Sequence, residues 1–170
     1  MKNISLIGFM ACGKSTIGRV LAHEMKYSFV DIDKKIEKRQ KMKISKIFDT
    51  HGEEYFRKVE TETLEKYLLK EKTVISTGGG IVLNPKNVDI LYENSFVVFL
   101  DVPFDILAER AAANNQRPLF REREAAYKLW SERYPIYRSA AHFIINENED
   151  IILKTVHRIM AEYYNYMKNL

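Results

Sequence analysis

Short hydrophobic runs alternate along the chain with longer segments that have helical character. Five runs predict β-strands, at residues 4–7, 27–30, 73–76, 96–100 and 143–145. The run at 96–100 is hydrophobic at every position, which is typical of a parallel strand that helices cover on both faces. Strands and helices therefore alternate along the chain. This order predicts a three-layer α/β/α sandwich with a five-stranded parallel sheet.

The segments between the strands predict the helices. They span residues 16–25, 34–70, 85–91, 104–113 and 151–167. The long second segment has breaks near residues 42–45 and at residues 51–52. Residues 121–128 are highly charged, so they are expected to form either part of a lid or a solvated helix face, ahead of a further segment at 130–141.

The first strand leads into Gly8-Phe9-Met10-Ala11-Cys12-Gly13-Lys14-Ser15, which fits the pattern Gly, four residues, Gly-Lys-Ser. A strand, a glycine-rich loop and a helix in this order form the context that a phosphate-binding loop requires. The glycines allow the loop amides to turn inward, and the helix N-terminus adds partial positive charge. Lys14 would then reach the β- and γ-phosphates of a nucleotide, and the Ser15 hydroxyl would ligate Mg²⁺. A chance match in a turn is the alternative, which the flanking strand and helix disfavour.

Two acids, Asp31 and Asp33, follow the second strand. In open α/β sheets the carboxyl ends of the strands face the ligand crevice. Because the two acids are two residues apart, an extended chain would point both side chains the same way. One could lie near a metal and the other near a substrate hydroxyl. Capping of the helix that begins near Lys34 is compatible with both roles.

Three consecutive glycines, Gly78, Gly79 and Gly80, follow the third strand. Three glycines in a row cost backbone entropy on folding. We therefore expect them to bring the main chain close to a ligand, with amide hydrogens exposed as donors. A tight turn is the alternative, but a tight turn rarely needs three glycines.

Composition narrows the class of protein. A chain of 170 residues, with 46% hydrophobic and 29% charged residues, is expected to form one soluble domain over residues 1–170. The net charge of +4 suits anionic small ligands, and the basic residues are spread along the chain, so no nucleic-acid partner is expected. Neither a signal peptide nor an apolar run of membrane-spanning length is recognisable. Cys12 is the single cysteine, which favours a reducing compartment. We expect a cytoplasmic protein without a membrane partner.

These features converge on phosphoryl transfer, which needs positioning and charge neutralisation more than covalent chemistry. Arginines spaced through the second half of the chain suit bidentate binding of phosphate or carboxylate. Few residues remain outside the nucleotide-binding core, so we expect the acceptor of the phosphoryl group to be a small molecule. The chain is therefore expected to be a small-molecule kinase rather than a translational or motor NTPase.

Taken together, the motifs resemble those of the shikimate kinase family over essentially the whole chain. They are Leu6 to Met10, Asp31-Ile32-Asp33, Ile47-Phe48, Gly52-Glu53, Phe56-Arg57 with Glu60, Ile75 to Gly80, Arg117-Pro118-Leu119, and Arg133 ahead of Pro135 to Arg138. The phosphate loop alone indicates only a nucleotide, whereas this set in this order is specific. The resemblance implies ATP-dependent phosphorylation of the 3-hydroxyl of shikimate, giving 3-phosphoshikimate in aromatic amino-acid biosynthesis. It also implies a P-loop NTPase fold with a shikimate-binding region at about 31–62 and a mobile lid at about 112–125.

The resemblance further implies how the nucleotide is bound. The nucleotide phosphates would be bound by Ala11, Cys12, Gly13, Lys14, Ser15 and Thr16. Ser15 would ligate Mg²⁺, and Asp31 would approach the same ion through water. Arg110 would lie near adenine. Arg117 would swing in from the lid to bridge the transferring phosphate.

The acceptor side of the site is implied in the same way. Asp33 would bind shikimate hydroxyls and act as a base, which makes Lys14, Asp33 and Arg117 the catalytic residues. Arg57 and Arg133 would clamp the shikimate carboxylate. In the run Gly78-Gly79-Gly80, Gly79 would give a backbone contact to a ring hydroxyl.

The chain departs modestly from the family pattern. Ala11 and Cys12 stand where the family usually has residues such as Gly-Ser, the lid looks short, and residues 146–150 lack an arginine that some members have near adenine. One alternative is another P-loop small-metabolite kinase, which would give no reason for Arg57, Arg133 and the glycine run. The other is a catalytically silent shikimate-binding module, against which the presence of all three catalytic residues argues. We expect a monomer.

Overall fold

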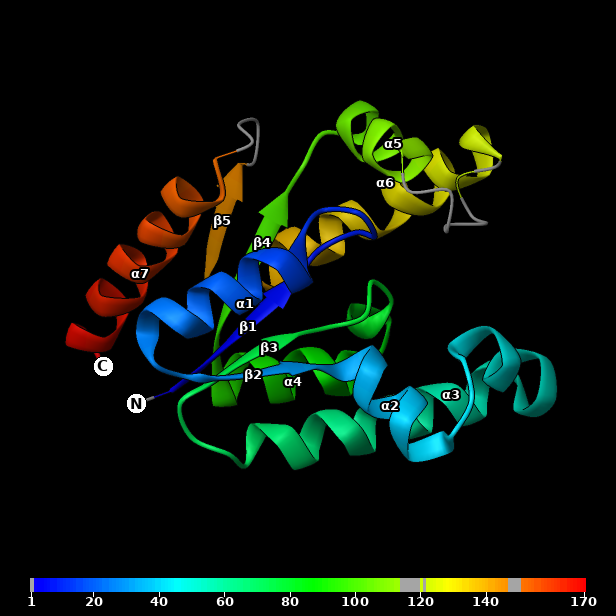
Figure 1. Ribbon diagram of the computed structural model, residues 1–170, viewed down its shortest axis with the longest axis horizontal. Helices are drawn as coiled ribbons and strands as arrows, with labels where there is room; N and C mark the ends of the chain where they lie inside the picture. Colours follow the sequence, from blue (N-terminus) through cyan, green and yellow to red (C-terminus); the bar gives the residue numbers. More distant parts are fainter. Residues whose placement is uncertain (1, 114–119, 121, 147–150) are drawn as a thin grey trace.

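A single parallel sheet forms the centre of the molecule (Figure 1). The computed structural model describes residues 2–113, 120, 122–146 and 151–170. The strands are β1 (Asn3–Ile7), β2 (Ser28–Asp31), β3 (Thr73–Ser76), β4 (Ser95–Asp101) and β5 (Phe143–Asn146). They pair in parallel in the order β2-β3-β1-β4-β5. The predicted five-stranded parallel sheet is confirmed.

Helices cover both faces of this sheet, which confirms the predicted three layers. The helices are α1 (Lys14–Met25), α2 (Ile32–Gln40), α3 (Ile44–Leu68), α4 (Pro85–Asn94), α5 (Phe104–Ala113), α6 (Arg123–Ala140) and α7 (Ile152–Lys168), with a 3₁₀ turn η1 (Ile81–Leu83). Helices α1 and α7 pack together on one face, and α4 and α6 lie on the other, with α3 beside α4 (Figure 1). Among the described residues, no helix has the length and apolarity needed to cross a membrane.

Strand β1 forms the middle of the core. It lies between β3 and β4, with Ile4 opposite both Val74 and Phe96. All five of its residues are buried, because helices cover both of its faces. The segment that follows β1 therefore begins at the centre of the carboxyl edge of the sheet.

The chain turns directly from β2 into α2. Asp31 is the last residue of β2 and the N-cap of α2, and its Oδ1 accepts a hydrogen bond of 3.2 Å from the Lys34 amide. The predicted extended conformation through Asp33 is therefore wrong, because capping by Asp31 starts the helix at Ile32. The predicted break at residues 51–52 is confirmed, since Gly52 has φ 82 and ψ 173 within α3.

Residues 123–140 form one helix rather than the two segments expected at 121–128 and 130–141. Its buried residues Ala126, Tyr137 and Ala140 recur at helical spacing on both sides of Pro135. Proline removes one backbone donor from a helix, but here the buried stripe continues past it and holds the helix to the core. Residues 114–119 and 121, which form half of the expected lid, lie outside the described residues, so the lid stays a prediction.

Candidate active site

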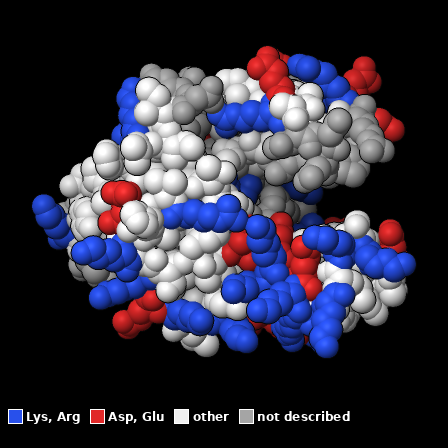
Figure 2. Space-filling view, viewed as in Figure 1, with Lys and Arg blue, Asp and Glu red and all other residues white. Residues whose placement is uncertain are grey.

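Segments that follow three neighbouring strands meet at one edge of the sheet. Because β1, β2 and β3 are parallel, the residues after them all lie at the carboxyl end, where α/β sheets bind ligands. The register places Asp31 opposite Ser76, and the Thr77 amide donates to the Leu6 carbonyl at 3.2 Å. The surface is hollowed between the part that carries α2 and α3 and the part that carries α5 and α6 (Figure 2).

The phosphate loop has the turn that its sequence predicts. Gly13, the N-cap of α1, has φ 96, and Gly8 has φ 143. Ala11 also has a positive φ of 66, a conformation that costs a residue with a Cβ about 1–2 kcal/mol. No side chain caps α1, so the first amides of this helix are left for a ligand, with the helix dipole favouring an anion.

Lys14 is turned into the phosphate loop. Its side chain is buried, and its ammonium donates to the carbonyl oxygens of Gly8 at 2.7 Å and Phe9 at 2.9 Å. It also lies 3.4 Å from Cys12 Sγ. An ammonium group has three N–H donors. A charged phosphate oxygen that took the place of one neutral acceptor would make a stronger hydrogen bond to it. These contacts keep Lys14 in the loop where a phosphate would bind.

Ser15 links the start of α1 to the end of β2 through a side-chain hydrogen bond. Its hydroxyl donates to Asp31 Oδ2 at 2.7 Å and lies 3.3 Å from the Ser76 hydroxyl. A hydroxyl beside a carboxylate is an oxygen set that Mg²⁺ accepts when phosphates and water complete its octahedron. Within the described residues, no group of three or more His, Cys, Asp or Glu could hold a metal by itself. The residues present fit a Mg²⁺ that is shared with a nucleotide.

Asp33 lies in the first turn of α2, between the phosphate loop and α3. Burial raises its pKa from 3.8 to about 6, and the Asp31 carboxylate adds to this shift, whereas Lys14 and Arg57 oppose it. Gly78 makes room for the carboxylate, since a Cβ there would be 2.8 Å from Asp33 Oδ1. A carboxylate with this pKa is ionised at neutral pH and still basic enough to accept a proton.

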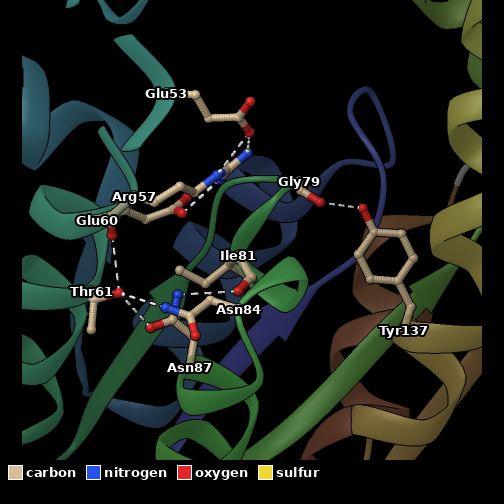
Figure 3. A network of polar contacts seen from close by, with 9 residues as sticks. All are labelled: Glu53, Arg57, Glu60, Thr61, Gly79, Ile81, Asn84, Asn87 and Tyr137. Atoms are coloured by element: carbon tan, nitrogen blue, oxygen red, sulfur yellow. Dashed lines mark hydrogen bonds and ion pairs between the residues drawn. The ribbon is translucent and has the colours of Figure 1, made fainter. Parts of the chain in front are cut away.

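Two glutamates of α3 hold Arg57 (Figure 3). Its Nη1 donates to Glu60 Oε2 at 2.7 Å, while Nε and Nη2 donate to Glu53 Oε1 at 3.4 and 3.3 Å. Glu60 is fully buried and has a raised pKa, because burial outweighs the opposing effect of Arg57. The guanidinium is thereby fixed as a planar fork, the geometry that suits a carboxylate ligand.

The glycine run gives space to these side chains. A Cβ on Gly78 would meet Asp33, and a Cβ on Gly80 would lie 2.5 Å from Arg57 Nη2. At Gly79 the nearest atom would be the Met10 amide nitrogen, at an ordinary 3.6 Å. Two of the three glycines therefore let acidic and basic side chains of α2 and α3 approach the end of β3, a reason that the sequence pattern did not reveal.

Helix α6 adds Arg133 and Tyr137 to the site. Arg133 is partly buried, and its Nε has no hydrogen-bond partner among the described residues. Tyr137 is completely buried, and its hydroxyl donates to the Gly79 carbonyl (Figure 3). Burial raises the pKa of Tyr137, and the positive charge of Arg133 opposes this shift. The glycine run is thus bound to α6 through the Tyr137 hydroxyl, four residues after Arg133.

Basic side chains gather on the surface over α2 and α3 (Figure 2). Exposed examples are Lys34, Lys38, Arg39, Lys41, Lys43 and Lys46. Some are paired with acids, as Arg39 is with Glu62 at 2.9 Å. The excess of positive charge beside the hollow favours anionic ligands.

Comparison with known proteins identifies this arrangement. A family model described as shikimate kinase matches residues 10–164. The chain belongs to the shikimate kinase family. Among its relatives, the shikimate kinase of Sulfurihydrogenibium sp. (strain YO3AOP1) is 40% identical over 163 residues, which cover 95% of this chain and 98% of that protein. The shikimate kinase of Dictyoglomus turgidum is 43% identical over 155 residues, covering 88% of this chain and 90% of that one.

Solved shikimate kinases have the same fold. The enzyme from Acinetobacter baumannii, determined in complex with shikimate, superposes with a TM-score of 0.91 at 31% identity, covering 98% of this chain and 94% of that one. The enzyme from Aquifex aeolicus gives a TM-score of 0.86 at 35% identity, covering 97% and 98%. The chain is therefore an enzyme of the shikimate kinase family with the P-loop NTPase fold, and neither another small-metabolite kinase nor a silent binding module is favoured.

The remaining predicted residues of this shikimate kinase are placed as follows. Cys12 is buried behind the Lys14 ammonium, and Thr16 is exposed in the first turn of α1. Arg110 lies in the last turn of α5. Arg117 lies outside the described residues, so its role stays a prediction.

Sequence reasoning did not assign a role to Glu60 or Tyr137. Glu60 follows Arg57 by three residues, and Tyr137 follows Arg133 by four, so helical spacing alone could have paired each with its arginine. Glu60 Oε1, which has no partner within the described part of the chain, would lie 3.1 Å from a Cβ on Gly78. The two residues thus belong to the same cluster as the predicted ones.

Proposed function

We propose that this kinase transfers the γ-phosphoryl group of ATP to the 3-hydroxyl of shikimate, forming 3-phosphoshikimate for aromatic amino-acid biosynthesis. The position of Asp33 carries this proposal: it follows β2 at the same edge of the sheet as the phosphate loop, and its carboxylate and Glu60, the partner of Arg57, both border Gly78. A group that accepts the proton of the attacking hydroxyl must lie between the phosphate donor and the part of the site that holds the acceptor. An acceptor with a carboxylate accounts for Arg57 and Arg133.

The donor side follows from the phosphate loop. Amides of residues 11–16 bind the phosphate oxygens of ATP, and Lys14 donates to the β- and γ-phosphates. Mg²⁺, held by Ser15 and through water by Asp31, would supply charge neutralisation for the leaving phosphate. Arg110 lies near adenine, and Arg117 bridges the transferring group from a mobile lid at about 112–125.

The acceptor side uses the groups around the glycine run. Arg57 and Arg133 bind the shikimate carboxylate, and the Gly79 amide donates to a ring hydroxyl, with Gly78 and Gly80 forming the rest of this wall. Asp33 accepts the proton of the shikimate 3-hydroxyl, while the oxygen of that hydroxyl bonds to the γ-phosphorus of ATP. The bond from phosphorus to the oxygen of ADP breaks, and its electrons remain on ADP.

We further propose that residues 1–170 act as one kinase domain, with a shikimate-binding region at about 31–62. The enzyme works as a monomer in the cytoplasm, with shikimate and ATP as its ligands and neither nucleic acid nor membrane as a partner. The single cysteine, Cys12, supports a reducing compartment.

A coupled assay of ADP release tests the proposed reaction. Mg-ATP is supplied with shikimate, with shikimate methyl ester, with gluconate or with a nucleoside monophosphate. We expect rapid release with shikimate alone, and much slower release with the ester, because it lacks the charge that Arg57 and Arg133 bind. ATP binding without shikimate-dependent release would refute the proposed function and point to another acceptor.

A further inference from the structure

The three carbonyl groups of the glycine run are held in different ways. The Gly78 carbonyl accepts from the Ile81 amide at 3.2 Å, and the Gly80 carbonyl accepts from the Leu83 amide at 3.1 Å. Both are local turn contacts that lead into η1. The Gly79 carbonyl accepts instead from the hydroxyl of Tyr137, which is 58 residues away in the sequence. The orientation of the middle peptide thus depends on a side chain of α6.

The surroundings of Tyr137 fix this hydroxyl in place. The ring is completely buried and stacks on Phe99 with ring centroids 5.3 Å apart. Because burial raises the pKa of Tyr137, the phenol keeps its proton and donates a hydrogen bond to the Gly79 carbonyl. Arg133 precedes Tyr137 by four residues on α6, so the two side chains lie about one helical turn apart, and the charge of Arg133 acts on the phenol.

The peptide between Gly79 and Gly80 needs such a contact. Glycine on both sides gives the peptide unusual conformational freedom, so it can rotate at little steric cost. Rotation would reverse the Gly80 amide together with the Gly79 carbonyl. Within the described part of the chain, the amides of Gly79 and Gly80 donate to no acceptor, so they are free to donate to a ligand.

We propose that Tyr137 is a positioning residue for the acceptor: its hydroxyl fixes the Gly79–Gly80 peptide relative to α6, the helix that carries Arg133, so that the Gly80 amide and the carboxylate clamp are presented to shikimate in one arrangement. This proposal rests on the proposed function for the identity of the acceptor. It assigns Tyr137 no contact with the reacting atoms.

Tyr163 provides a matched control. It is also completely buried, and its hydroxyl donates at 2.7 Å to the carbonyl of Lys2, immediately before β1. Lys2 precedes the amino end of the sheet, whereas the glycine run follows the carboxyl end of β3. Replacing either tyrosine by phenylalanine removes one buried hydroxyl and leaves one carbonyl without its donor. The Tyr163 hydroxyl also lies 3.2 Å from that of Tyr27, so Tyr163→Phe removes at least as many contacts as Tyr137→Phe, at the opposite end of the sheet.

Steady-state kinetics of the Tyr137→Phe and Tyr163→Phe enzymes provide the first test. For Tyr137→Phe we expect KM for shikimate to rise about tenfold, the equivalent of one lost hydrogen bond, with KM for ATP and kcat within about threefold of wild type. Tyr163→Phe should keep the wild-type KM for shikimate. Incorporation of 4-aminophenylalanine at position 137, which keeps a donor, should restore KM. An unchanged KM in Tyr137→Phe, or an equal rise in Tyr163→Phe, would overturn the proposal.

Hydrogen exchange followed by mass spectrometry gives a test that does not depend on turnover. Amides of residues 77–83 should exchange faster in Tyr137→Phe than in wild type, and should be unchanged in Tyr163→Phe. Equal exchange in all three proteins would overturn the positioning role. A wild-type enzyme without shikimate-dependent ADP release would instead overturn the proposed function, and the exchange experiment would still decide the role of Tyr137.

Discussion

Gly80 and Arg57 are in such close contact that no other residue fits at position 80 without moving the arginine. A Cβ there would lie 2.5 Å from Nη2 and 2.6 Å from Nη1, while Glu60 and Glu53 hold the guanidinium from the other side. In Gly80→Ala the guanidinium must shift, because it is the end of a flexible side chain. We expect KM for shikimate to rise about 10- to 100-fold, the usual cost of a displaced positioning group, with KM for ATP unchanged.

The comparison variant for this prediction is Arg57→Lys, which keeps the positive charge and loses the planar pair of donors that a guanidinium offers to a carboxylate. Its kinetic pattern should match that of Gly80→Ala. Kinetics of both variants over a range of shikimate concentrations check this, and a Gly80→Ala enzyme with wild-type KM for shikimate would contradict the inferred crowding.

The pH dependence of the reaction should follow Asp33. Since its pKa is raised to about 6, kcat/KM for shikimate should fall about tenfold per pH unit below that value. Asp33→Asn should bind ATP but lose most turnover at every pH. A pH profile measured in wild type checks the first statement. A flat profile between pH 5 and 7 would show that Asp33 does not accept the proton.

Asp33 should also lower the stability of the folded protein at neutral pH. An acid whose pKa is higher in the folded state than the ordinary 3.8 favours folding only while it is protonated, so its contribution is present at low pH and lost as pH rises through about 6. At pH 8 we expect Asp33→Asn to be about 1–3 kcal/mol more stable than wild type. The difference should vanish near pH 4, as urea unfolding at the two pH values can establish.

Lys14 should contribute to both turnover and loop stability. Lys14→Met removes the charge that stabilises the transferring phosphate, so we expect kcat to fall at least about 10²- to 10³-fold. It also leaves the carbonyls of Gly8 and Phe9 without their donor, which costs about 1–3 kcal/mol if water does not replace it. Single-turnover kinetics and thermal unfolding measure the two effects. Turnover close to wild type would refute the assigned role.

Ala11 is a position where glycine should stabilise the protein. Its φ of 66 is unfavourable for alanine, and relief of this strain should exceed the entropy lost with glycine. We expect Ala11→Gly to gain about 0.5–1 kcal/mol of unfolding free energy. Ala125→Gly, in an exposed turn of α6, should instead lose about 1 kcal/mol. Equal losses in the two variants would contradict the strain at Ala11.

A buried polar network ties α3 to η1 and α4 (Figure 3). The hydroxyl of Thr61 lies 2.8 Å from Asn87 Oδ1 and accepts from Asn84 at 3.3 Å, while Asn87 donates to the Ile81 carbonyl at 3.2 Å. Thr61→Val leaves buried amide groups unpaired, so we expect a loss of about 1–3 kcal/mol. Thr63→Val removes only a bond to the carbonyl of Val59 on the same helix and should cost less. Urea unfolding of both variants checks the order.

Local patterns were sufficient to predict the sheet, the phosphate loop and most helices. Hydrophobic runs and glycine spacing depend on neighbours in the chain, and they placed β3 at Thr73–Ser76 and α5 at Phe104–Ala113 as the structure has them. The motif set also led to the family, which the family model over residues 10–164 confirms. The pattern did not reveal the start of α2 at Ile32 or the continuity of α6, because a cap and a continuous buried stripe set them.

The sequence alone therefore determined the class of fold, the phosphate loop and the residue types that the proposed chemistry needs, because each of these depends on short segments of the chain. Only the tertiary structure decided how those segments meet. The contact of Tyr137 with Gly79 spans 58 residues, and the crowding of Arg57 against Gly80 joins α3 to the end of β3. Such contacts depend on how α3 and α6 pack against the sheet, which no local pattern in the chain specifies.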